Sequence, residues 1–146
     1  MKKITFLMML FTSAQAGAAI NQWTSTRVQG VTEYRIQNKQ GAELLMTCSP
    51  EDNAFVQYTS PDGKTLTSGN DDGRSIQAQT DSGDTFLIND TLSDAGGSNF
   101  EAFWDAARKS HRIHITATGL TSATFTFSNA ATTLPEFDKS GCLTRM

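Results

Sequence analysis

Residues 98–118 read SNFEAFWDAARKSHRIHITAT, and within this stretch the sequence pattern changes from helical to extended. Ser98 and Glu101 form an S-x-x-E capping box, which is typical of a helix N-terminus. The spacing of three and four residues then places four apolar side chains on one helical face: Phe100, Phe103, Trp104 and Ala107. We therefore predict an amphipathic helix over about 98–110. From Arg112 onward apolar and polar residues alternate, which predicts a strand.

Short alternating segments surround this helix on both sides. The predicted strands are Thr24–Val28, Thr32–Ile36, Ala42–Cys48, Ala54–Thr59, Lys64–Ser68, Ser75–Thr80, Thr85–Asn89, Arg112–Thr118 and Ala123–Ser128. Turn sequences such as SPDG at 60–63 separate them. We therefore expect a mainly β (α+β) fold, an antiparallel β-sandwich or barrel-like sheet with one amphipathic helix.

Two further segments carry local signals. Residues 94–97, DAGG, are expected to be a flexible joint before the helix. Thr133 and Glu136 form a second capping box, with Pro135 in the first turn, where its missing N–H costs nothing. This box predicts a short C-terminal helix or turn that carries Leu134 and Phe137 and ends at Gly141.

The N-terminal residues 1–19, MKKITFLMMLFTSAQAGAA, have the order of a secretory signal peptide: lysines, a short apolar core, then small residues. Cleavage is expected after Ala16 or Ala19. The apolar core is shorter than the ~20 residues that span a bilayer, so we expect no stable membrane anchor. Residues 20–146 are long enough for a single β-rich domain. The form of the signal indicates a bacterial protein that is periplasmic or secreted.

The charge balance argues against one class of partner. The 146 residues carry a formal net charge of −3, and no basic stripe is present. Because phosphate binding needs such a stripe, we expect no nucleic acid partner. The partner is expected to be another protein, and the oligomeric state is left open. The candidate partner-binding loops contain the polar residues Asn70, Asp71, Asp72, Asp90 and Asp94.

The two cysteines, Cys48 and Cys142, are separated by 94 residues. In an oxidising compartment an isolated pair usually forms one disulfide, which is our prediction. The alternative is a reactive thiol. No C-x-x-C motif and no cysteine–histidine spacing favours that alternative.

Candidates for chemistry are few. Ser110, His111 and Asp105 can be combined into a triad on paper, but no glycine-framed nucleophile turn accompanies them. His114 lies on the polar face of a predicted strand, and surface roles are the preferred interpretation of both histidines. The acidic turns do not fit the spacing of a calcium-binding loop. We therefore predict no catalytic residue, no cofactor and no metal.

The second half of the chain has a recognisable order. The helical stretch FEAFWDAARK at 100–109 leads into HRIHIT, then TFTFS, and then a segment of small residues that closes on Cys142. Over roughly residues 42–142 this order resembles small exported bacterial proteins of the invasion-associated locus B family. The resemblance implies an exported, β-rich accessory protein, and it assigns no functional residue.

These observations favour an exported periplasmic or secreted protein of the bacterial envelope that binds rather than catalyses. The alternative is a periplasmic inhibitor or immunity protein that blocks a hydrolase of the lysozyme type or an effector toxin. Such a protein would present an acidic loop to a cationic partner, because opposite charges accelerate association. A small hydrolase is the third and least favoured interpretation.

Overall fold

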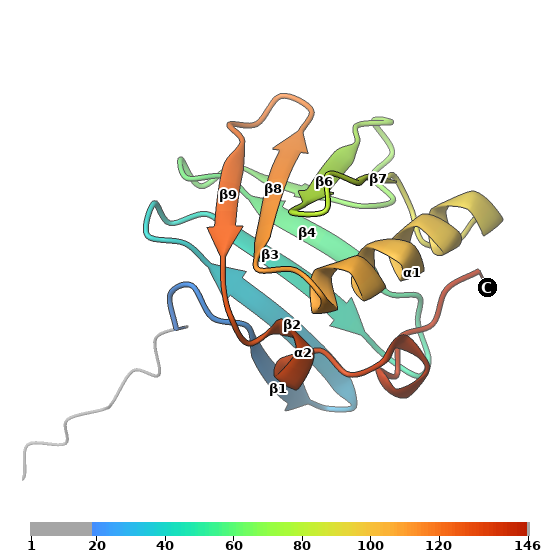
Figure 1. Ribbon diagram of the computed structural model, residues 1–146. Helices are drawn as coiled ribbons and strands as arrows, with labels where there is room; N and C mark the ends of the chain where they lie inside the picture. The colour runs from blue at the N-terminus through green and yellow to red at the C-terminus, as the bar shows by residue number, and fades with distance from the viewer. Residues whose placement is uncertain (1–18, 146) are drawn as a thin grey trace, which may run out of the picture.

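The computed structural model describes residues 19–145, so all of the predicted signal peptide except Ala19 lies outside the described residues. Residues 19–145 form two antiparallel sheets (Figure 1). The first sheet contains, in spatial order, β1 (Thr24–Val28), β2 (Val31–Gln37), β3 (Glu43–Cys48), β4 (Phe55–Thr59) and β5 (Thr65–Thr67). The second contains β7 (Thr85–Ile88), β6 (Ile76–Thr80), β8 (Arg112–Ala117) and β9 (Ala123–Thr126). The predicted fold class is thus confirmed.

The first sheet is a simple meander in which each strand pairs with the next one along the chain. β3 lies at its centre, and five of its six residues are buried. β1 lies at one edge, where four of its five residues are exposed. The turn between β1 and β2 has positive φ at both Gln29 and Gly30, which is the conformation that a two-residue hairpin requires.

The second sheet shows the alternation that the sequence predicts. In β8, Ile113 and Ile115 are buried, whereas His114 is half-buried and Thr116 is exposed. β8 pairs with β6 as well as with β9, so the chain returns to this sheet after the helix. The outer face of the sheet is therefore polar and its inner face apolar.

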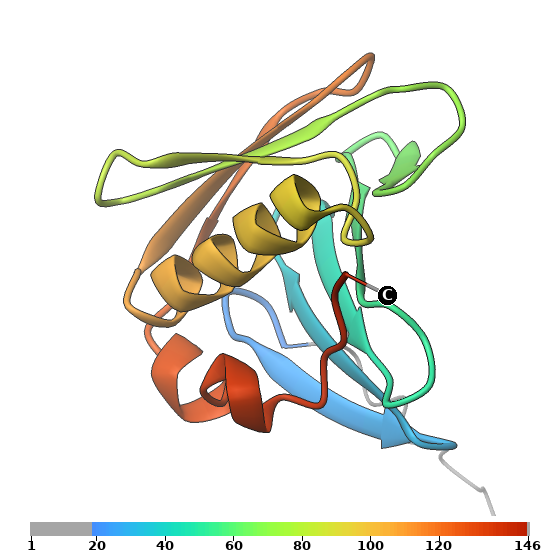
Figure 2. The ribbon, with the colours of Figure 1, turned by 90° about the vertical axis from the view of Figure 1, so that its right-hand side faces the viewer.

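The helix α1 (Asp94–Arg108) lies between the two sheets (Figure 2). Trp104 meets Tyr34 of the first sheet edge to face, with ring centroids 5.0 Å apart. The neighbouring Phe103 packs on Phe86 of the second sheet at 6.0 Å. Both helical side chains are fully buried, so the predicted aromatic face of α1 joins the two sheets.

The helix begins one turn before the predicted capping box at Ser98. Its N-cap is Ser93, whose hydroxyl oxygen accepts a hydrogen bond from the N–H of Gly96 at 3.0 Å. The expected flexible joint at 94–97 is therefore wrong, because these residues form the first turn of α1. Gly96 and Gly97 are both buried there, and a side chain on either would collide with neighbouring loops. Packing has overridden the low helix propensity of glycine.

The short C-terminal helix is confirmed, but the second capping box does not start it, because Thr133 ends this helix. α2 covers Ala130–Thr133, and a separate 3₁₀ turn covers Phe137–Lys139. Leu134, between them, is extended with φ −88° and ψ 111°. A residue before proline is pushed out of the helical region, so Pro135 stops any helix from passing through Leu134. The carbonyl of Pro135 instead accepts a hydrogen bond from the indole N–H of Trp104 at 2.8 Å.

Cys48 and Cys142 form a disulfide with their Cα atoms 4.3 Å apart, as predicted. It links the end of β3 to the C-terminal segment.

The hydroxyl of Tyr58 also connects two distant segments, because it donates a hydrogen bond to the carbonyl of Thr121 at 2.6 Å. Burial, and then the charge of Asp62, raises the pKa of Tyr58 to about 12, so this donor stays protonated. Across residues 19–145, no helix has the length and apolar character needed to cross a membrane.

Candidate functional site

Three loops and the C-terminal segment meet at one end of the molecule, which faces the viewer in Figure 2. We call this region the loop end and define it as residues 49–55, 68–75, 89–94 and 143–145. Backbone hydrogen bonds join its parts: Ala54 N–H to the Leu143 carbonyl (2.8 Å), Gly69 N–H to the Asn89 carbonyl (2.6 Å) and Arg145 N–H to the Thr91 carbonyl (2.9 Å). The hydroxyl of Thr91 also donates to the carbonyl of Ala54. The loops are therefore fixed relative to one another.

Asp90 organises the segment that leads into α1. Its carboxylate accepts hydrogen bonds from the N–H groups of Leu92 (2.9 Å) and Ser93 (2.7 Å), and from the Ser93 hydroxyl (3.1 Å). The backbone N–H of Ser93 is the main cause that lowers the pKa of Asp90 below its ordinary value of 3.8, and partial burial opposes it. The carboxylate is thus ionised near neutral pH and is occupied by its own loop.

Asn70 organises the second predicted loop in a similar way. Its side-chain NH₂ donates to the carbonyls of Thr67 (3.0 Å) and Arg74 (2.8 Å), and its oxygen accepts from the Arg74 N–H (3.0 Å). Asp71 and Asp72 are exposed, and Asp72 forms an ion pair with Arg74 at 3.1 Å. Asn70 therefore shapes the loop, whereas the two aspartates face solvent.

The structure brings the two predicted partner-binding loops together. The loop with Asn70, Asp71 and Asp72 contacts the loop with Asp90 and Asp94 through the hydrogen bond between Gly69 and Asn89. Asp94 is exposed in the first turn of α1.

Sequence reasoning missed other members of the loop end: Glu51, Asp52, Phe55 and Leu92. Only the tertiary fold places the first three beside the predicted loops. Leu92 carried a weak signal of its own, as an isolated leucine in the polar sequence NDTLSD.

A small pocket of about 200 Å³ opens at the loop end, between β4 and the two loops. Two apolar lining residues are accessible: Leu92 is 54% exposed and Phe55, on β4, is 36% exposed. Asn53 also lines it, and its side-chain oxygen is buried with no hydrogen-bond partner among residues 19–145. The pocket therefore combines accessible apolar surface with a hydrogen-bond acceptor, the side-chain oxygen of Asn53, that has no partner among the described residues.

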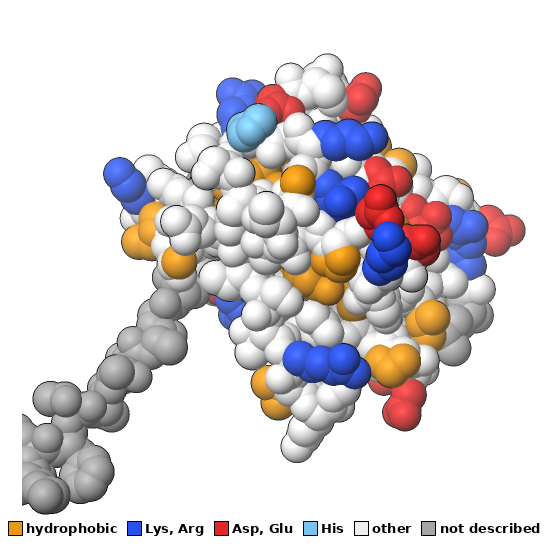
Figure 3. All heavy atoms as spheres, turned by 60° about the horizontal axis from the view of Figure 1, so that its bottom comes forward, with side chains coloured by type: hydrophobic (Ala, Val, Ile, Leu, Met, Phe, Trp, Pro, Cys, Tyr) orange, Lys and Arg blue, Asp and Glu red, His pale blue; other side chains and the backbone are white. Residues whose placement is uncertain are grey.

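The loop end carries most of the excess negative charge. Six acidic side chains lie on it (Glu51, Asp52, Asp71, Asp72, Asp90 and Asp94) against two basic ones, Arg74 and Arg145. Both arginines are engaged, Arg74 with Asp72 and Arg145 with Glu101 at 2.7 Å. Residues 19–145 as a whole have 15 acidic and 10 basic side chains, so the loop end contributes −4 of a net −5. Figure 3 shows acidic and basic side chains side by side toward the right of the face in view.

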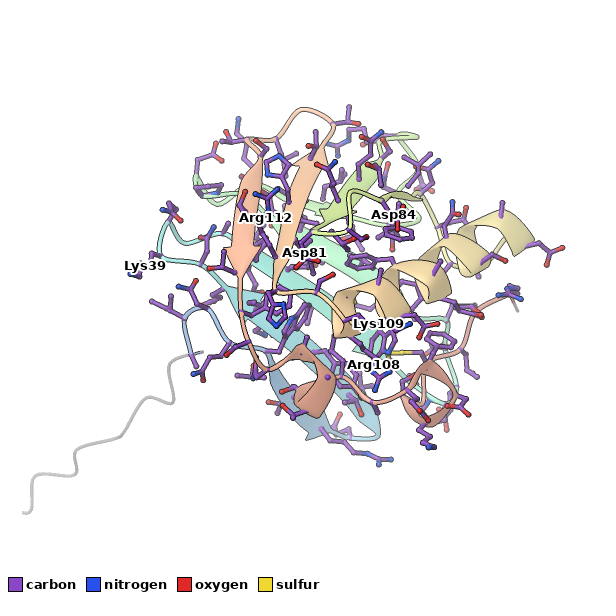
Figure 4. All side chains as sticks on the ribbon, in the orientation of Figure 1. Lys39, Asp81, Asp84, Arg108, Lys109 and Arg112 are labelled. Atoms are coloured by element: carbon purple, nitrogen blue, oxygen red, sulfur yellow. A yellow bond between two sulfur atoms is a disulfide. The ribbon has the colours of Figure 1, made fainter. Side chains whose placement is uncertain are left out.

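The residues that were considered for catalysis have structural contacts. The Ser110 hydroxyl donates to the Ala106 carbonyl at 2.6 Å, at the C-terminal end of α1. The His111 N–H donates to the Asp81 carboxylate at 2.7 Å, and Figure 4 shows Asp81 near the start of β8. This N–H lowers the pKa of Asp81. Within residues 19–145, no three His, Cys, Asp or Glu side chains gather closely enough to hold a metal ion.

Comparison with known proteins identifies the family. A family model described as YfjT matches residues 21–134, which is well over half of the chain and includes both sheets and α1. No curated protein and no solved structure matches the chain. The similarity to the invasion-associated locus B family stays a prediction. The match over residues 21–134 establishes that the chain belongs to the YfjT family.

Proposed function

We propose that this chain is an exported, non-enzymatic binding protein of the bacterial envelope, and that its loop end binds a positively charged partner protein. One observation carries this proposal. The loop end combines two accessible apolar side chains, Phe55 and Leu92, with acidic residues, and hydrogen bonds hold its loops together.

The apolar side chains supply the affinity. Protein interfaces typically have a central apolar anchor and a polar rim. Leu92 and Phe55 border one pocket that Asp90 also lines, and the other acidic residues belong to the same adjoining loops. Burying either side chain against a partner is expected to contribute about 1–2 kcal/mol, or roughly tenfold in affinity.

The charge of the loop end supports a basic partner. A net −4 concentrated on the three loops and the C-terminal segment produces a local negative potential. Such a potential accelerates encounter with a positively charged surface and disfavours acidic partners, and salt weakens both effects.

The hydrogen bonds that order the loops reduce the entropic cost of binding. Asp90 and Thr91 hold the segment around Leu92 by hydrogen bonds within the molecule. A loop that is already ordered loses less conformational entropy when it docks than a mobile loop does. This arrangement also favours the inhibitor alternative, because a rigid loop with an exposed leucine at its surface is suited to blocking the active site of a basic hydrolase.

Export is supported by the disulfide and by the order of residues 1–19. Disulfides persist mainly in oxidising compartments, and Cys48–Cys142 is paired. The test is the mass of the chain recovered from the periplasmic fraction of its own bacterium. An N-terminus at Gly17 or Ile20 is expected, and an intact Met1 in the cytoplasmic fraction would contradict export.

Affinity capture tests the binding surface. The wild type is immobilised and exposed to an envelope extract of its own bacterium, beside the variants Leu92→Ser and Phe55→Ser. Leu87→Ser is the matched control, because Leu87 is 38% exposed on the outer face of the second sheet. We expect a basic protein to bind the wild type and the control, and to bind each loop-end variant about tenfold more weakly.

Two outcomes would contradict the proposal. One is capture that does not depend on Leu92 or Phe55. The other is affinity that does not fall between 50 and 300 mM salt, since an acidic surface predicts such a fall. The inhibitor alternative is then tested by adding one equivalent of the chain to the captured partner. Loss of a muramidase or toxin activity supports inhibition, and unchanged activity supports an accessory role.

A further inference from the structure

One edge of the second sheet is open. β9 is the last strand of this sheet, and among residues 19–145 no strand pairs with its outer side. The N–H of Phe127 donates to the His111 carbonyl on the inner side, at 2.9 Å. Because backbone groups of successive residues point to opposite sides of a strand, those of Thr124 and Thr126 point outward.

This open edge borders a cleft of about 630 Å³. Thr124 and Thr126 form one wall. Asn38, Lys39 and Pro61, from two hairpin turns of the first sheet, and Asn21 lie around the rest. Figure 1 shows the turn between β2 and β3 and the segment before β1 on the open side of β9. The cleft runs beside about four residue steps of strand, or roughly 13 Å.

Asn38 already occupies one bonding position of the edge. Its side-chain NH₂ donates to the outward carbonyl of Thr124 at 3.1 Å, which is where the N–H of a neighbouring strand would lie. The asparagine is 6% exposed, and its oxygen accepts from the N–H groups of Gln40 and Ala42 at 3.1 and 3.0 Å. The outward N–H and carbonyl of Thr126 have no partner among residues 19–145.

We propose that this cleft binds an extended peptide segment of another protein, which adds a strand to the open edge of β9. Main-chain hydrogen bonds to Thr126 supply the affinity, as in other proteins that accept a strand at a sheet edge. The two hairpin turns flank the edge, so it is accessible to a single peptide strand and not to the edge of a second folded copy.

The lining of the cleft indicates the side chains of the segment. The lining side chains are mostly neutral and polar, and its charged or chargeable groups are Lys39 and His114, with no carboxylate among them. Figure 4 shows Lys39 extended at the margin of the molecule. The imidazole of His114 forms a hydrogen bond through Nδ1 with the Thr124 hydroxyl at 2.8 Å, which leaves Nε2 for a ligand. We expect a segment with hydroxyl, amide or carboxylate side chains on alternate positions.

A phage-displayed library of random octapeptides is the probe. Peptides selected on the folded wild type are synthesised and labelled, and their affinity for the wild type and for Thr126→Pro is measured by fluorescence polarisation. Thr126→Pro removes one outward N–H and breaks no hydrogen bond to β8. Ser25→Pro is the matched control. The hairpin turn closes on the pair Val28–Val31, so the N–H of Ser25 points outward from β1, which is an edge strand of the first sheet. We expect about a tenfold loss with Thr126→Pro and none with Ser25→Pro.

Backbone chemistry separates strand addition from binding by side chains. Each peptide is also made with N-methyl groups on alternate amide nitrogens, in one version at the odd positions and in another at the even positions. Because only every second N–H of an added strand faces β9, only one of the two versions should lose binding. Circular dichroism and thermal melting confirm that each proline variant is folded. Equal affinity for all variants, or selection of no peptide, would overturn the proposal. Self-association that depends on Thr126 would also overturn it. Leu92→Ser should bind the peptides normally, so this proposal and the loop-end proposal fail independently.

Discussion

Replacing Cys48 and Cys142 together with alanine is expected to lower the free energy of unfolding by about 4–5 kcal/mol. The disulfide joins residues 94 positions apart, and its loss frees the unfolded chain to expand. The loop-entropy relation for a closed loop of this length gives about 4.7 kcal/mol at 25 °C. Domains of this size are usually stable by about 5–15 kcal/mol, so the cross-link accounts for a large share of the total.

Urea unfolding followed by tryptophan fluorescence measures this loss, because Trp23 and Trp104 are both buried. With a slope of about 1.5 kcal/mol per molar urea, the midpoint should fall by about 3 M. Reduced wild type is the matched control, since it keeps the sulfur atoms of both cysteines and loses only the bond between them. A difference below about 1 kcal/mol between oxidised and reduced protein would refute the reasoning, because the cross-link would then not restrain the unfolded state.

Three substitutions test the start of α1. Gly96→Ala should lower the free energy of unfolding by about 2 kcal/mol, because the new Cβ would lie 2.6 Å from Oδ1 of Asp90 and against its carbonyl. Gly97→Ala should cost less, about 1 kcal/mol, since its nearest contact, Cγ of Arg145 at 2.6 Å, belongs to a side chain that can shift further than the backbone carbonyl of Asp90. Thermal melts compare the two variants, and equal losses would contradict this explanation. Asp90→Asn should cost about 1 kcal/mol at pH 7, because it removes a charge at a helix N-terminus. Folding lowers the pKa of Asp90, so its contribution is complete above the ordinary value of 3.8 and disappears as the pH falls through the lower native value. Urea midpoints of wild type and Asp90→Asn should therefore converge toward pH 2, and a constant gap would show that charge is not the cause.

The strands could be predicted to within one or two residues because two local signals coincide at each. Apolar residues alternate along β8 and β9, and turn sequences separate the other strands. The division into two sheets could not be predicted, because it depends on which strands pair after the chain returns from α1.

The start of α1 was predicted at the wrong serine, because both Ser93 and Ser98 are suitable N-cap residues. Ser98 had the stronger local motif, and Gly96 and Gly97 have low helix propensity. Ser93 is nevertheless the cap, and glycine suits the first turn because the backbone carbonyl of Asp90 leaves no space for a side chain at Gly96. The sequence around the helix start does not predict this contact.

The candidate site was predicted in part. The acidic loops were recognised because aspartate and asparagine favour turns, and exposed turns are common binding sites. Their meeting through Gly69 and Asn89 is a tertiary event, and so is the approach of Phe55. The cleft beside β9 was missed for the same reason, because its walls come from distant segments, such as Asn38 and Thr124, which are 86 residues apart.

The contacts of Leu143–Arg145 make the loop end sensitive to proteolysis near Cys142. The carbonyl of Leu143 accepts a hydrogen bond from Ala54, and the N–H of Arg145 donates one to the carbonyl of Thr91, so this short segment joins two loops that lie far from it in sequence. Cleavage of the chain after Cys142 would remove both bonds and leave the disulfide intact. If the loop end binds a partner as proposed, such cleavage should weaken that binding although both sheets stay paired.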